Sequence, residues 1–101
     1  MEEIVVRDNP GAGRFEVRIG DQLAVALYQV TPRGIRFTHT EVPKELGGRG
    51  IATALVRTGL AEARRRGLKV LPDCPFFARY IKEHPEEQDI LHQDYRARLG
   101  L

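Results

Sequence analysis

One segment of the chain has the residue types that suit the binding of an anion. Residues 46–53 read Leu-Gly-Gly-Arg-Gly-Ile-Ala-Thr, so three glycines lead directly into an amphipathic pattern that begins at Ile51. Glycines allow positive φ angles and let the backbone approach a ligand closely. N–H groups in the first turn of a helix have no partners inside the helix, so they can bind phosphate oxygens. The segment therefore indicates either a site for a pyrophosphate-bearing cofactor or simply a turn that starts a helix.

Two familiar phosphate-binding loops do not fit this segment. The Walker loop requires Gly-Lys-Ser/Thr, whereas Gly50 is followed by Ile51 and Ala52. The dinucleotide-binding fingerprint requires a buried parallel strand before the glycines and an acidic residue about twenty positions later. Here residues 43–45, Pro-Lys-Glu, precede the glycines. Nucleotide hydrolysis and hydride transfer are therefore disfavoured.

Three further side chains are candidates for chemistry. Cys74 precedes Pro75, which suits the first position of a helix, and a helix N-terminus can stabilise a thiolate nucleophile. His39 and Glu41 are two residues apart and share a face of a strand, where either could act as a general base toward an ammonium group. The structural alternatives are a small buried thiol at Cys74, a core histidine at His39 and a solvated Glu41.

Composition limits the class of protein. With 101 residues the chain is the size of one domain, and its formal charge of +2 does not favour nucleic acid as a partner. No apolar stretch is long enough to span a membrane, and residues 1–4, Met-Glu-Glu-Ile, do not look like a secretion leader. The single cysteine excludes an internal disulfide and fits a reducing compartment. No His, Asp, Glu or Cys set has metal-ligand spacing. We expect a cytoplasmic protein that binds no metal.

The first half of the chain predicts an antiparallel meander. Residues 4–6 and 15–19 carry strand-forming residues on either side of a Pro- and Gly-containing loop, and residues 23–30 read as a mostly buried strand. Residues 35–41 form the next strand after a Pro-Arg-Gly turn. Strict alternation places Ile35, Phe37, His39 and Glu41 on one face of that strand, and Arg36, Thr38 and Thr40 on the other.

The second half predicts helices. Apolar residues recur at helical spacing from Ile51 until Gly67, which is placed to end the helix. Residues 68–71 then read as a short strand, and the intervening helix predicts that it pairs in parallel with the strand at 35–41. A second helix starts at Pro75, and the residues from His92 onward have too weak a pattern to predict firm packing.

Several separated blocks of the sequence resemble the short, single-domain members of the GNAT acetyltransferase superfamily. The resemblance covers residues 14–91 and rests on blocks at residues 39–43 (His-Thr-Glu-Val-Pro), 48–52 (Gly-Arg-Gly-Ile-Ala), 55–56 (Leu-Val), 74–76 (Cys-Pro-Phe) and 84–86 (His-Pro-Glu). It implies a minimal α/β acyl-CoA N-acyltransferase fold: a mixed, mostly antiparallel sheet, a central helix after the glycine loop and a second C-terminal helix. The domain would span residues 1–91, with a tail at 92–101.

The resemblance also implies a cofactor and a reaction. Acetyl-CoA would bind at Val42, where the strand is expected to diverge from its parallel neighbour, and its pyrophosphate would lie around the loop formed by Gly47, Gly48, Arg49, Gly50, Ile51, Ala52 and Thr53. Similar short acetyltransferases carry a cysteine in the Cys-Pro-Phe context that is proposed to act in acetyl transfer, which implies a role for Cys74. The chain departs from the family by having Gly47 where glutamine or arginine is usual, and by lacking the two helices that usually follow the first strand.

The sequence thus predicts an acetyltransferase with an amine acceptor, acting directly with Glu41 or His39 as base or through Cys74. The alternative is a non-catalytic acyl-CoA-binding or regulatory module. A third reading, a basic nucleic-acid or protein-interaction domain, would leave the glycine loop without a ligand. A monomer or weak homodimer is expected.

Overall fold

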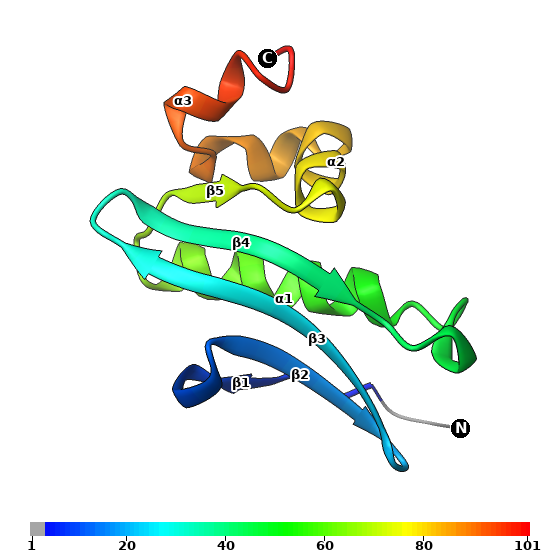
Figure 1. The fold of residues 1–101 in the computed structure, drawn as a ribbon. Coiled ribbons are helices and arrows are strands. Elements are labelled where there is room, and N and C mark those ends of the chain that lie inside the picture. Colours follow the sequence, from blue (N-terminus) through cyan, green and yellow to red (C-terminus); the bar gives the residue numbers. More distant parts are fainter. Residues whose placement is uncertain (1–3) are drawn as a thin grey trace.

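A computed structural model describes residues 4–101. Residues 1–3 lie outside the described part, and with them most of the segment that we expected not to be a leader. Five strands form one sheet, and the main helix lies behind it in Figure 1. The elements in chain order are β1 Arg7–Asn9, β2 Arg14–Ile19, β3 Gln22–Thr31, β4 Gly34–Glu41, α1 Ile51–Arg65, β5 Val70–Pro72, α2 Pro75–Glu83 and α3 Gln93–Arg96, with single 3-10 segments at Pro10–Ala12, Lys44–Leu46 and Pro85–Ile90.

The sheet follows the predicted meander. Its strand order is β1-β2-β3-β4-β5, and each neighbouring pair from β1 to β4 is antiparallel. The last pair, β4 and β5, is parallel, as the intervening helix predicts. The strand predicted at 68–71 begins two residues later, at Val70. No helix within residues 4–101 is long and apolar enough to cross a membrane.

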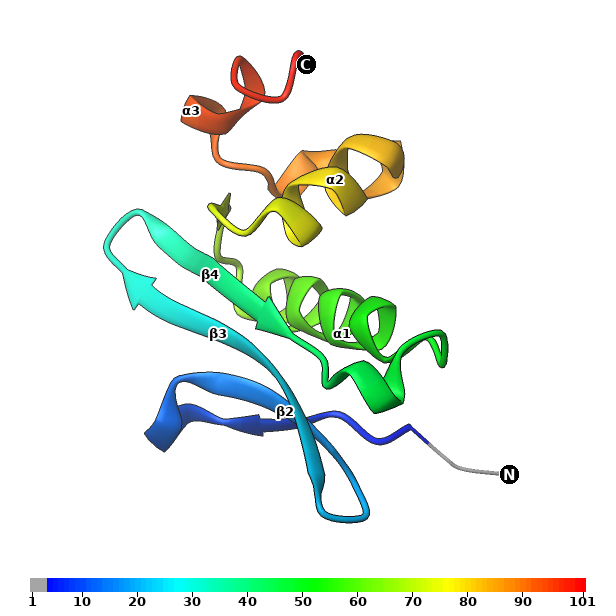
Figure 2. The same ribbon diagram turned by 45° about the vertical axis from the view of Figure 1, so that its right-hand side comes forward.

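The helices α1 and α2 cover one face of this sheet, called here the inner face, and Figure 2 shows both on the same side. The residues that recur at helical spacing in α1 and were expected to face the core are buried except for Ala52; the buried ones are Ile51, Leu55, Val56, Gly59, Leu60 and Ala63. From the sheet, Phe37 stacks on Phe77 of α2 with ring centroids 4.0 Å apart. Gly59 of α1 lies against these two rings, where a Cβ atom would be only 2.9 Å from Phe37. The inner face is therefore a closely packed core that fixes both helices relative to β4.

The strand predicted at residues 4–6 is wrong in position. Pairing with β2 begins only at Arg7, which lies opposite Glu16. Ile4 and Val6 instead pack partly buried against the core, and they line a hollow beside Ala54 and Arg57 of α1. The apolar pattern there reflects packing against the helix rather than strand pairing.

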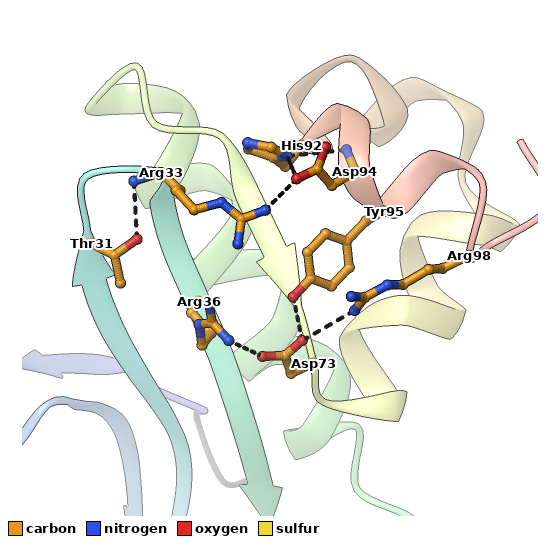
Figure 3. Close-up of polar contacts among 8 residues, drawn as sticks. All are labelled: Thr31, Arg33, Arg36, Asp73, His92, Asp94, Tyr95 and Arg98. Atoms are coloured by element: carbon orange, nitrogen blue, oxygen red, sulfur yellow. Dashed lines mark hydrogen bonds and ion pairs between the residues drawn. The ribbon is translucent and has the colours of Figure 1, made fainter.

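The C-terminal segment, residues 92–101, packs against the rest of the domain, although its weak sequence pattern did not predict firm packing. Tyr95 is 4% exposed, and its hydroxyl donates a short hydrogen bond to Asp73 (Figure 3). Asp73 also accepts a hydrogen bond from Arg36 at 2.8 Å. At the end of the segment the guanidinium of Arg98 stacks 4.5 Å above the Tyr95 ring. Segment 92–101 therefore packs on the end of β5, next to the start of α2.

Candidate active site

A cavity of about 410 Å³ lies between the end of β4 and the start of α1. Three parts of the chain meet around it: the end of β4, the glycine loop with the first turn of α1, and the first turn of α2. They are Thr40, Val42, Leu46, Gly47, Gly48, Gly50, Ile51, Ala52, Thr53 and Phe76. Seven of the eight residues predicted to bind the cofactor thus surround one hollow, and Arg49, the eighth, stands in the same loop.

The glycine loop has the backbone conformation that glycine favours. Gly48 and Gly50 both have φ of +78°, a region that costs other residues energy, and Gly50 is the N-cap of α1. A Cβ atom at either position would meet nothing within 4 Å, so conformation rather than crowding favours glycine there. The first turn of α1 contains no acidic residue. Its N–H groups and the helix dipole therefore favour an anion at this end of the cavity.

The strands β4 and β5 separate beside this cavity. Their parallel pairing covers only residues 35–37 of β4 and 70–72 of β5, after which the chain turns into α2 while β4 continues to Glu41. The backbone hydrogen bond that closes the junction is the N–H of Cys74, which donates to the carbonyl oxygen of Phe37 at 2.8 Å. Beyond it, the edge of β4 that faces α2 has no strand partner within the described residues. This is the divergence that the family resemblance implied.

A β-bulge in β4 reverses the predicted faces of its last residues. Tyr28 lies opposite Phe37, but the next residue back, Leu27, lies opposite His39, which leaves Thr38 as an extra residue. Since opposed residues share a face of the sheet, Phe37 and His39 lie on opposite faces. The prediction that His39 and Glu41 share the face of Ile35 and Phe37 is therefore wrong.

His39 and Glu41 accordingly lie on the other, outer face of the sheet. The Nε2 atom of His39 is 3.4 Å from Oε2 of Glu41, and their side chains are 58% and 71% exposed. The bulge thus leaves two titratable groups side by side in solvent at the end of β4. They can exchange protons with a group that arrives from the outer face.

Thr40 takes the inward place that sequence reasoning gave to His39. It pairs with the fully buried Ala26 of β3, and its Oγ1 is 3.3 Å from Sγ of Cys74. Cys74 is 3% exposed and is the N-cap of α2, as its position before Pro75 predicted. Thr40 also lines the cavity. The role of Thr40 could not be predicted from the sequence, because a bulge leaves no mark in a simple alternation of residue types.

The turn that carries Cys74 is held from the outer side as well. Asp73, its neighbour, accepts from Tyr95 and Arg36, and Arg98 lies 4.0 Å away (Figure 3). Burial, and secondly the hydrogen bond to Asp73, raise the pKa of the Tyr95 phenol, and the charges of Arg36 and Arg98 oppose this shift. Within residues 4–101 no group of three or more His, Cys, Asp or Glu side chains is arranged to hold a metal ion.

Comparison with known proteins points to one family. The model of the GCN5-related N-acetyl-transferase family matches residues 14–90. Protein NATD1 of Gallus gallus is 37% identical over 82 residues, which cover 78% of this chain and 74% of that protein. Protein NATD1 of Homo sapiens is 37% identical over 78 residues, covering 74% and 69%. A solution structure of a GCN5-like candidate N-acetyltransferase from Staphylococcus aureus has a TM-score of 0.68 at 26% identity, with 90% of each chain covered.

Proposed function

The chain belongs to the GCN5-related N-acetyltransferase family, and on that premise we propose that it transfers an acetyl group from acetyl-CoA to an amine. The observation that carries the proposal is the cavity at the divergence of β4 and β5, which the glycine loop, the first turn of α1 and the start of α2 share. An acetyl thioester bound there supplies an electrophilic carbonyl carbon. The residues around the cavity bind and orient it.

The proposed binding roles follow from the local chemistry. Backbone N–H groups at Gly48, Gly50 and the first turn of α1 would receive the pyrophosphate, since two glycines leave open space there and the helix dipole favours negative charge. Val42 and Phe76 offer apolar surface for the pantetheine arm. The unpaired edge of β4 beyond residue 37 offers backbone groups to its amides. Gly47 adds no side chain to this site.

The two sets of candidate catalytic residues lie on opposite sides of β4. Cys74 and Thr40 lie on the inner side, where Thr40 also lines the cavity. His39 and Glu41 lie on the outer side, where a free amine can reach them. In direct transfer, Glu41 or His39 takes a proton from the ammonium, so that the amine nitrogen can attack the carbonyl carbon. The carbon–sulfur bond then breaks, and the sulfur leaves as the CoA thiol after taking up a proton.

In the covalent alternative, the sulfur of Cys74 is acetylated first and the amine then takes the acetyl group from it. The thiol proton passes to the departing CoA sulfur, so the exchange is balanced without a further reagent. Both routes need the same bound donor and differ only in whether Cys74 carries the acetyl group.

Calorimetric titration with acetyl-CoA, followed by intact mass measurement of the same sample, tests this proposal. The proposal expects saturable 1:1 binding and acetylation of an added amine. A labile acetyl adduct that Cys74→Ala abolishes supports the covalent route, and full activity of Cys74→Ala supports direct transfer. Cys74→Ser is the matched variant, since it keeps the size and N-cap position of the side chain. Binding without any transfer identifies an acyl-CoA-binding module, and absence of binding contradicts the proposal.

A further inference from the structure

The outer face of the sheet carries an ordered distribution of charge. It consists here of the residues of β1 to β4 that point away from α1, and no helix crosses in front of β2, β3 or the end of β4 in Figure 1. The ladder places Arg7 opposite Glu16, Glu16 opposite Val25, and Val25 opposite Glu41. One row across the sheet thus runs from an arginine at the β1 edge to the exposed glutamate at the end of β4.

The β1 and β2 side of this face is basic. A hollow of about 590 Å³ there is lined by Val5, Arg7, Glu16, Arg18 and Gly20. The single acid, Glu16, already accepts hydrogen bonds from Arg14 at 2.6 Å and from Asn9 at 3.0 Å. Within residues 4–101 the side chains of the two exposed arginines of the hollow, Arg7 and Arg18, take part in no hydrogen bond or ion pair, and only the charge of Arg18 acts weakly on Glu16. The hollow therefore offers two cationic groups to an anionic ligand.

The middle of the face is apolar and its far side is anionic. Leu23, Val25 and Leu27 of β3 point outward and are only partly buried. At the end of β4, Glu41 is 71% exposed beside His39, and it stands between Thr40 and Val42, which both line the cavity. A cationic amine is attracted to Glu41, whereas a carboxylate is attracted to the arginines of the hollow.

We propose that the outer face binds an acidic peptide segment and presents its lysine to Glu41 at the end of β4, with an acidic side chain of the peptide in the hollow at Arg7 and Arg18. This inference rests on the proposed function and names its acceptor class. Three strand spacings separate β1 from β4, about 14 Å. An extended peptide advances about 3.3 Å per residue, so the acid stands about four residues from the lysine.

Synthetic peptides test this assignment. One peptide carries a single lysine with an aspartate four positions away, and its partner carries asparagine at that position. The wild-type protein is expected to acetylate the aspartate peptide with a kcat/KM about fivefold to tenfold higher, the size of two partly exposed charge contacts. The preference lies in KM rather than kcat, because the arginines contact a remote part of the peptide. It decreases as ionic strength rises.

The variant Arg7→Gln/Arg18→Gln is expected to lose this preference while its kcat/KM for the asparagine peptide stays within about twofold. The matched control, Arg65→Gln/Lys69→Gln, removes two positive charges near the C-terminal end of α1, and should keep the preference. The inference is overturned if the wild-type protein acetylates both peptides at equal rates, or if Arg7→Gln/Arg18→Gln still prefers the aspartate peptide.

A binding measurement separates this inference from the proposed function. Amide signals of the outward residues of β1 to β4 are followed by NMR while the aspartate peptide is added without acetyl-CoA. Shifts there support the acidic-peptide surface even if no acetyl group is transferred, in which case only the proposed function fails. Acetylation of both peptides without such shifts and without a charge preference retains the proposed function and rejects the surface.

Discussion

Replacing Gly59 by alanine tests the packing that holds both helices against β4. The added Cβ would stand 2.9 Å from Cε1 of Phe37 and 3.2 Å from Cε2 of Phe77. Both rings are fully buried and stacked on each other, so neither can move aside alone. Overpacking of this kind costs about 1–3 kcal/mol, whereas alanine gains about 1 kcal/mol over glycine in helix propensity. The net expectation is a loss of about 1 kcal/mol of unfolding free energy.

Thermal unfolding followed by circular dichroism measures this loss. For a domain of this size it corresponds to a Tm about 4–8 °C lower. Ala61→Gly, at an exposed position of the same helix, is the control, because it should cost about 1 kcal/mol through propensity alone. The carbonyl of Phe37 accepts from the N–H of Cys74, so Gly59→Ala should also shift the Cys74 amide signal, and Ala61→Gly should not. A Tm equal to or above that of the wild type would refute this account of the packing.

Three other substitutions have expected outcomes. Gly50→Ala introduces backbone strain of about 1 kcal/mol at φ +78° and should weaken the binding of acetyl-CoA at least fivefold in calorimetry. The control Gly67→Ala is similarly strained at φ +67° but lies outside the cavity, so it should bind acetyl-CoA with the affinity of the wild type. Burial, and secondly the hydrogen bond to Asp8, raise the pKa of Tyr28 to about 12, so the stability from its protonated phenol is complete below pH ~10 and lost as pH rises toward 12. In urea unfolding at alkaline pH, Tyr28→Phe should flatten this decline, and an unchanged decline would contradict the assignment. Tyr95→Phe removes a hydrogen bond to the Asp73 carboxylate and should lower the unfolding free energy measured in urea by about 1.5–3 kcal/mol. The control Arg33→Gln breaks only the exposed ion pair with Asp94 and should lower it by less than about 1 kcal/mol. Equal losses in the two variants would show that the Tyr95 contact adds no stability.

The order of the elements could be predicted because each follows from local chemistry. The change of apolar period at Ile51 marks the start of α1, and Pro75 marks the start of α2. The parallel pairing of β5 follows from the helix between the two strands. These signals depend on neighbours in the chain, and the structure agrees with them.

The faces of β4 could not be predicted, because they depend on a contact between strands. One extra residue, Thr38, changes which of His39 and Thr40 points inward, and it does so through the register with β3. Likewise, Tyr95 is attached through Asp73, 22 positions earlier in the chain, so nothing close to it in sequence indicates its burial. Long-range partners decided both cases.

Amide chemical shifts measured while acetyl-CoA is added locate the donor site directly. We expect the largest shifts on titration at residues that line the cavity, namely Val42, Gly48, Gly50 and Thr53, and at Cys74 beside Thr40. Outer-face residues of β1 and β2 should shift little with acetyl-CoA alone. No saturable shifts, or shifts centred away from the glycine loop and the end of β4, would contradict the proposed donor site.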